Sequence, residues 1–256
     1  KGGTGKSTIA AALGLRAARD GRKTLVVAPS GTARLGGLFG LEVSTRPTRV
    51  APNLFVASID AEGAMREYVE ALLSSRLLTD ALFHQKFSRG FLHGIPGLRS
   101  WALLGKAWFY SQQGRSGPKL PEAPFDTVVL DAPSTGDSTD LLRVPSVVSD
   151  LMPVGPFRKD ADDCAAFLRD PRSTRVVAVT LPEDLPVTES LEIVRVVRDD
   201  LRLPLAPLVV NQLRPELFSD SLRARLKNLD ATVESSDERV RSTFHAAHGR
   251  AVLEGE

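Results

Sequence analysis

Short apolar runs rich in β-branched residues recur along this chain, and stretches with helical spacing separate them. A continuous apolar run of about four to eight residues is typical of a strand that is buried on both faces. The pattern predicts strands at residues 23–28, 54–59, 126–131, 174–181 and 205–211. Because the predicted helices fall between these strands, we expect an α/β fold with a doubly wound, mainly parallel sheet.

Helical spacing is found at residues 9–18, 158–169 and 187–200. Another helix is predicted to begin at Asp60, whose carboxylate is a favourable cap. Apolar residues at helical spacing follow it and indicate one apolar face: Met65, Tyr68, Val69, Leu72, Leu73 and Leu77. After Leu213 the chain is charged with a helical pattern, and a short strand is possible near residues 231–233.

Residues 77–110 are apolar but lack strand signals, and Gly94, Pro96 and Gly97 divide them into at least two helices. Both tryptophans, Trp101 and Trp108, lie in this segment. Two interpretations are open: a helical subdomain that packs its own core, or a helical lid that presents apolar surface to a partner. With a proline-bearing linker at residues 114–124, the pattern predicts a single domain over residues 1–256 with a helical subdomain inserted at about residues 60–124.

Composition narrows the class of protein. Lys and Arg number 33 against 31 Asp and Glu, a formal charge of +2, so there is no basic footprint for nucleic acid. The single cysteine, Cys164, excludes a disulfide framework within one chain and a multi-cysteine metal site. No apolar run approaches the ~18 residues of a membrane span, and no signal peptide precedes the first motif. We expect a soluble, cytoplasmic protein that does not span a membrane.

The first residues, Lys1-Gly2-Gly3-Thr4-Gly5-Lys6-Ser7-Thr8, have the composition of a phosphate-binding loop. Glycines let backbone N–H groups close around phosphate oxygens, and the following helix directs its positive N-terminus at the anion. Lys6 is placed to reach the β- and γ-phosphates of ATP, and the Ser7 hydroxyl to ligate Mg²⁺. The full pattern also requires a glycine and a strand before Lys1, so we expect the start of this chain to be truncated.

Two strand-end residues add to this prediction. Asp131 follows an apolar strand, where Mg²⁺ beside a phosphate loop needs an acidic partner; a helix cap or turn is the other interpretation. Asn211 ends another strand, and an asparagine amide can pair with a donor and an acceptor on the edge of a base. An asparagine at a strand end is equally often a turn residue.

The loop resembles the deviant phosphate loop of dimeric P-loop ATPases, which carries an extra lysine at the position of Lys1. Residues 129–136, Val-Leu-Asp-Ala-Pro-Ser-Thr-Gly, are similar to the Asp-Ala-Pro-x-Thr-Gly-His signature of the ArsA-type family, the arsenite-pump and tail-anchored-protein-targeting ATPases. Residues 141–145 continue the match, and residues 179–189 resemble the family's Thr-x-Pro-Glu stretch. Val209-Val210-Asn211 resembles the strand end at which the family recognises adenine.

The resemblance implies an ATPase that couples ATP binding and hydrolysis to the handling of a protein client. In it, the loop from Gly2 to Thr8 holds ATP, Ser7 and Asp131 hold Mg²⁺, and Asn211 contacts adenine. Lys6 and Asp131 then serve catalysis, and Lys1 reaches across a dimer to the partner's nucleotide. ATP closes the dimer, which is a homodimer or a heterodimer with a paralogue, and the helical segment offers a surface to the client.

The chain also departs from the family. The family's first switch segment has an aspartate that orients the attacking water, but here Val27-Ala28-Pro29-Ser30 places alanine there, or Ser30 if the alignment shifts by two. Neither side chain is a general base, so slow hydrolysis is expected. Asp137 stands where the signature has histidine and is the nearby acid that could compensate. The Cys-x-x-Cys zinc site and the arsenite-binding cysteines are absent, so arsenite sensing is not expected.

Three functions therefore remain open at this stage. One is an ATPase switch for a protein client. Another is a catalytically weak nucleotide-binding subunit that partners an active paralogue, which the Ala28 departure favours. The last is a metabolic ligase or reductase on the same scaffold, although a reductase needs cluster cysteines that Cys164 alone does not supply.

Overall fold

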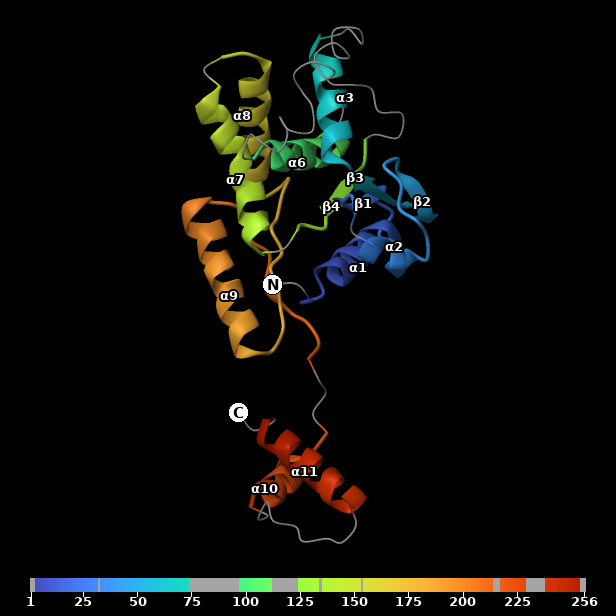
Figure 1. The fold of residues 1–256 in the computed structure, drawn as a ribbon, viewed down its shortest axis with the longest axis vertical. Coiled ribbons are helices and arrows are strands. Elements are labelled where there is room, and N and C mark those ends of the chain that lie inside the picture. Colours follow the sequence, from blue (N-terminus) through green and yellow to red (C-terminus); the bar gives the residue numbers. More distant parts are fainter. Residues whose placement is uncertain are drawn as a thin grey trace. The chain divides into compact units, whose positions relative to one another are not determined.

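The computed structural model describes residues 3–31, 33–73, 97–111, 124–133, 135–152, 154–213, 217–228 and 238–253. The chain divides into two compact units, Lys1–Asn211 and Gln212–Glu256 (Figure 1). Among the described residues, all the strands lie in the first unit, and the second unit has two helices.

A mainly parallel sheet forms the centre of the first unit. The strands of this unit in chain order are β1 (Thr24–Pro29), β2 (Thr48–Ala51), β3 (Leu54–Ile59), β4 (Thr127–Leu130), β5 (Val179–Thr180) and β6 (Val209–Val210). The first four form the central sheet, and β5 and β6 form a separate two-stranded sheet. The spatial order is β2-β3-β1-β4, with β1 parallel to β3 and β4 and with β2 antiparallel to β3. β5 pairs with β6 in parallel, and a bridge between Val176 and Leu205 extends this pair. Each predicted strand is confirmed, the last two in shorter form.

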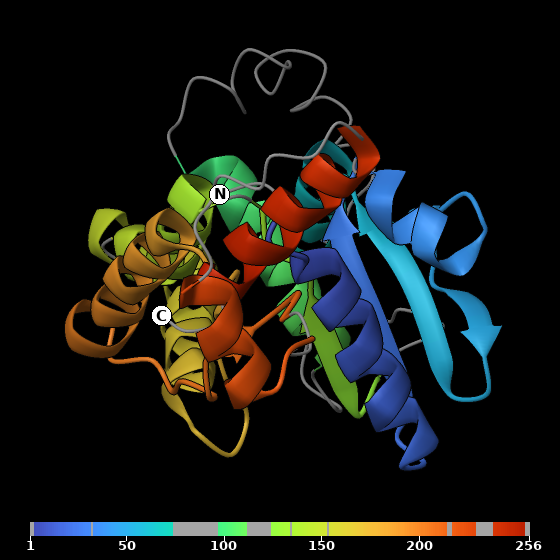
Figure 2. The same cartoon turned by 90° about the horizontal axis from the view of Figure 1, so that it is seen from below.

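Helices cover both faces of the sheet, as the doubly wound prediction requires (Figures 1 and 2). They are α1 (Lys6–Arg19), α2 (Ala33–Phe39), α3 (Ala61–Leu73), α6 (Leu98–Ser111), α7 (Thr135–Leu151), α8 (Pro156–Arg169), α9 (Asp184–Arg195) and the π-helical turn η1 (Val196–Asp200). Alternate residues of β1 face opposite layers. Leu25 and Val27 pack with α3, α6, α7 and α8, whereas Val26 and Ala28 pack with α1 and α2.

Local signals explain where the prediction of elements succeeded. The Asp60 side chain accepts a 2.7 Å hydrogen bond from the Gly63 N–H, so the predicted cap of α3 is confirmed. The prediction missed the helix α7. Pro145 lies inside it, and proline removes a helical hydrogen bond. Its buried residues Leu141 and Val144 join the core, so packing rather than propensity supports this helix.

The described part of the apolar middle segment shares its core with the sheet. Trp101 and Trp108 of α6 are buried in the same cluster as Leu25 and Val27 of β1. Residues 74–96 and the predicted linker, apart from its last residue, lie outside the described residues. The helical insertion at residues 60–124 and the single domain over residues 1–256 stay predictions.

A partly buried hydrogen bond joins α3 to α8. The Tyr68 hydroxyl donates to the Asp160 carboxylate over 2.7 Å, and the Tyr68 ring packs edge-on against Phe157 with centroids 4.9 Å apart. Burial raises the pKa of Asp160 above its usual range, although the hydrogen bond from Tyr68 lowers it. Burial also raises the pKa of the nearby Cys164 thiol to about 12, so this cysteine stays neutral and unreactive.

We expect Tyr68→Phe to destabilise the protein more at pH 7 than at pH 4. Because the folded pKa of Asp160 is raised, its favourable contribution to stability is complete below the unfolded pKa and is lost as pH rises through the folded pKa. The Tyr68 hydroxyl compensates for burial mainly when Asp160 is ionised. Its loss should cost about 1–2 kcal/mol at pH 7, allowing for partial exposure of Asp160. Denaturant titrations at the two pH values measure the difference.

Asp160→Asn is the matched background for this test. The neutral amide oxygen still accepts from Tyr68 but does not titrate in this range. In that background Tyr68→Phe should cost the same at both pH values. A pH dependence that persists there would assign the effect to another group.

The second unit contains α10 (Asp220–Asn228) and α11 (Glu238–Leu253), which pack against each other. The helical pattern predicted after Leu213 is thus confirmed for these ranges, whereas the possible strand near residues 231–233 lies outside the described residues. Within the part of the chain that is described, no helix has the length and apolarity needed to span a membrane.

Candidate nucleotide site

The glycine-rich loop opens α1 in the way an anion site requires. Gly3 and Gly5 have φ values of 95° and 89°, a region that favours glycine because a Cβ would be strained there. Gly5 is the N-cap of α1, and no side chain hydrogen-bonds to the helix end as a cap. The first turn has no acidic residue, so the positive end of the helix dipole is not neutralised locally. This geometry suits phosphate oxygens.

The predicted loop residues are placed in order along this turn. Thr4 is buried, Lys6 and Ser7 are half-buried in the first turn of α1, and Thr8 is exposed. Lys1 and Gly2 lie outside the described residues, and their roles stay predictions. Since α1 packs on β1, β3 and β4, the loop that precedes it lies at one end of the sheet.

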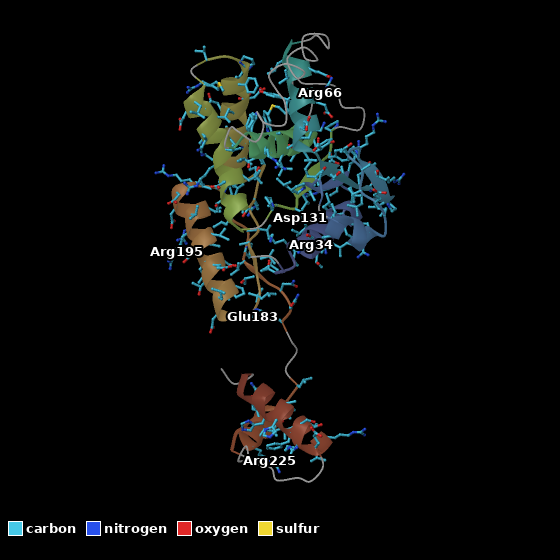
Figure 3. The ribbon with its side chains drawn as sticks, in the orientation of Figure 1. Arg34, Arg66, Asp131, Glu183, Arg195 and Arg225 are labelled. Atoms are coloured by element: carbon cyan, nitrogen blue, oxygen red, sulfur yellow. The ribbon has the colours of Figure 1, made fainter. Side chains whose placement is uncertain are left out.

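Asp131 lies directly after β4, and Figure 3 labels it together with Glu183. Its N–H donates to the Val27 carbonyl over 2.8 Å, which continues the β1–β4 pairing by one residue. The side chain is buried, and β4 packs against α1. Because β1, β3 and β4 are parallel, the residues that follow them, Ser30, Asp60 and Asp131, gather at the same edge of the sheet.

Asn211 is the last residue of the first unit in sequence, and its side chain contacts the phosphate loop. Its N–H donates to the Thr180 carbonyl of β5 over 2.8 Å, and its side-chain Nδ2 donates to the Thr4 carbonyl over 3.0 Å, across 207 residues of sequence. The structure thereby places the predicted adenine residue beside the phosphate loop. The contact with Thr4 was not predicted, and contact with adenine stays a prediction.

The Thr-x-Pro-Glu stretch, which also resembles the family, begins in β5. Thr180 is buried, and its hydroxyl donates to the Leu181 carbonyl over 3.3 Å. Glu183 is the N-cap of α9 but makes no side-chain cap hydrogen bond. The Thr-x-Pro-Glu stretch therefore forms the connection from β5 to α9.

The two alternatives for the missing switch aspartate occupy different environments. Ala28 is only 2% exposed and packs with Ala10 and Leu35 between the sheet and its helices. Ser30 is exposed just after β1, where its N–H donates to the Ile59 carbonyl over 2.9 Å. Of the two side chains, that of Ser30 is exposed to solvent and that of Ala28 is not. The side chain of Asp137 lies outside those described.

These residues fit the group that the motif implies. A glycine loop with positive φ values and a helix end without a side-chain cap suit a polyphosphate. The Ser7 hydroxyl and the Asp131 carboxylate are oxygen ligands of the kind that Mg²⁺ prefers. A mainly parallel sheet between helical layers, with such a loop opening a helix at its edge, defines the P-loop nucleotide-binding fold.

Comparison with known proteins identifies the branch of that fold. The sequence pattern of the family described as anion-transporting ATPase matches residues 1–159, and the chain belongs to this ArsA family. ATPase BagA of Mycobacterium tuberculosis strain H37Rv is 31% identical over 257 aligned positions, which cover 93% of this chain and 74% of that protein. The resemblance seen in the sequence is therefore confirmed.

Two further relatives carry related names. The arsenical pump-driving ATPase of Acidiphilium multivorum is 26% identical over 84% of this chain and 39% of its own length. The ATPase ASNA1 homolog of Entamoeba dispar is 22% identical over 84% of this chain and 75% of its own length. Membership of an ATPase family implies the use of ATP.

Proposed function

We propose that this protein binds Mg-ATP on the loop from Gly2 to Thr8 and hydrolyses it within a dimer that handles a protein client. The observation that carries the proposal is the arrangement of Gly5 at the N-cap of α1 with Asp131 at the end of the adjacent β4. Helix end and carboxylate are the anion and metal partners that phosphoryl transfer requires. Family membership supports the ATPase part of the proposal.

Each residue has a distinct role in this proposal. Lys6 neutralises the β- and γ-phosphates, and the Ser7 hydroxyl and Asp131 hold Mg²⁺ directly or through water. When bound, Mg²⁺ supplies charge neutralisation on the phosphates. Lys1 contacts the nucleotide of the partner subunit, and Asn211 contacts adenine. Hydrolysis in this class depends on positioning and electrostatics, with little covalent chemistry by the protein.

A second candidate is a catalytically weak subunit that partners an active paralogue. The environment of the switch segment favours it, since neither the buried Ala28 nor the exposed Ser30 offers a carboxylate to orient water. Such a subunit would bind ATP and take part in dimer closure, while the paralogue would supply most of the turnover. The client, in either case, is a protein, as the resemblance implies.

The test measures molar mass and turnover together. With a non-hydrolysable ATP analogue and Mg²⁺ we expect the mass of a dimer by light scattering, and with ADP that of a monomer. Lys1→Ala should keep nucleotide binding but weaken the dimer. A mass that does not respond to nucleotide would contradict homodimer closure, and turnover by the protein alone at ~1 s⁻¹ or more would exclude the weak-subunit alternative.

A further inference from the structure

We propose that Asn211 is a positioning residue that holds the phosphate loop in its binding conformation, in addition to any contact with a base. The inference rests on the proposed nucleotide site. It starts from the 3.0 Å hydrogen bond that the Asn211 side-chain amide donates to the Thr4 carbonyl. Both partners of this bond belong to the chain, so the bond acts directly on the conformation of the loop.

Asn211 is a rigid support for this bond. Its own N–H is bound to the Thr180 carbonyl over 2.8 Å, which ties it to the β5–β6 pair. The side chain is partly buried, and Thr4 is only 5% exposed. A hydrogen bond between two such groups is partly shielded from competing water, so it limits the conformations open to the loop.

The side chain also packs directly on Gly5. A Cβ added at Gly5 would lie 2.0 Å from Asn211 Nδ2 and 3.2 Å from its Cγ, which is closer than real Cβ contacts. Glycine at this position therefore serves two purposes: it permits the φ of 89° at the N-cap of α1, and it leaves space for the asparagine amide. Loop and amide are fitted to one another.

The bond to Thr4 has a consequence for the neighbouring amide. The Thr4 carbonyl and the Gly5 N–H belong to one planar peptide unit, in which they point in opposite directions. By fixing the carbonyl on its own side, Asn211 directs the Gly5 N–H to the other side. The side chain thus sets the orientation of one of the backbone donors that a phosphate loop uses.

The chemistry of the amide allows a second contact at the same time. An asparagine amide has two N–H donors and one carbonyl acceptor, and the bond to Thr4 uses one donor. The other N–H and the oxygen match the acceptor and donor on the adenine edge. Asn211 therefore links the occupancy of the base site to the conformation of the phosphate loop.

The test separates the loop role from the base role with a ligand that has no base. Binding of Mg-tripolyphosphate and of Mg-ATP to Asn211→Ala is measured by calorimetry. We expect the affinity for tripolyphosphate to fall about three- to tenfold, the scale of one hydrogen bond, and the affinity for ATP to fall at least as much. A residue that only contacts adenine would leave tripolyphosphate binding unchanged, and that result would overturn the proposal.

Amide hydrogen exchange gives a readout without any ligand. In Asn211→Ala the exchange of residues 4–9 should become faster. The control is Thr174→Val, which removes a 3.0 Å side-chain bond to the Phe167 carbonyl elsewhere in the same unit and should leave residues 4–9 unchanged. Unchanged exchange of the loop in Asn211→Ala, or an equal increase in the control, would overturn the proposal. If the wild-type protein binds neither ligand, the proposed function fails, and the exchange comparison still decides the role of Asn211.

Discussion

Replacing Lys6 by alanine is expected to remove most of the affinity for Mg-ATP. Lys6 is the first residue of α1 and follows the left-handed Gly5, so its ammonium group is tethered at the positive end of the helix beside the proposed phosphate position. A charge-assisted hydrogen bond contributes about 1.5–3 kcal/mol, and a lysine that bridges two phosphates makes two of them. The affinity should therefore fall by about 10²–10⁴-fold, as measured by calorimetry.

The matched control for this variant is Lys159→Ala. Lys159 is an exposed helix lysine on α8, so its removal changes the net charge equally without touching the loop. Thermal unfolding should be nearly the same for both variants and the wild type. If Lys6→Ala keeps its affinity for Mg-ATP within tenfold of the wild type, the loop is not the nucleotide site.

The sequence was sufficient for the central sheet because the buried strands are continuous apolar runs. In β1 both faces are covered, so Leu25, Val26 and Val27 are all buried and the run carries no polar interruption. The edge strand β2 was missed for the converse reason: its first two residues, Thr48 and Arg49, are polar and exposed. Edge strands owe their pairing to a neighbour, here β3, which local sequence does not reveal.

The candidate site was predictable where its chemistry is local. The loop and Asp131 are recognised because glycine, lysine, hydroxyl and carboxylate occur at fixed places relative to a strand or a helix. The bond between Asn211 and Thr4 could not be predicted, because it joins segments 207 residues apart and depends on the side-chain orientation in the folded state. Sequence alone placed Ala28 at the position of the switch aspartate, or Ser30 if the alignment shifts by two, and the structure adds that the two side chains differ in burial.

The difference in burial between Ala28 and Ser30 leads to a prediction about the rate of ATP turnover. If the family's water-orienting aspartate corresponds to Ser30, Ser30→Asp should raise ATP turnover by about 10²–10⁴-fold, the scale of a general-base group. The new carboxylate would stand at the exposed end of β1, at the same edge of the sheet as Asp131, where ionisation carries little desolvation penalty. Steady-state phosphate release measures the rate, and Ser30→Asn, of the same size but without charge, should give no increase.

Ala28→Asp should behave in the opposite way. Ala28 is 2% exposed among Ala10, Leu35 and other apolar side chains, so an ionised carboxylate there would lack water and a partner. We expect the variant to lose several kcal/mol of stability or to unfold, which thermal denaturation would detect, and to gain no activity. A folded Ala28→Asp protein with faster turnover would show that the other alignment is correct. Wild-type turnover of ~1 s⁻¹ or more would show that a water-orienting group is already present, because the missing carboxylate would then not limit the rate of hydrolysis.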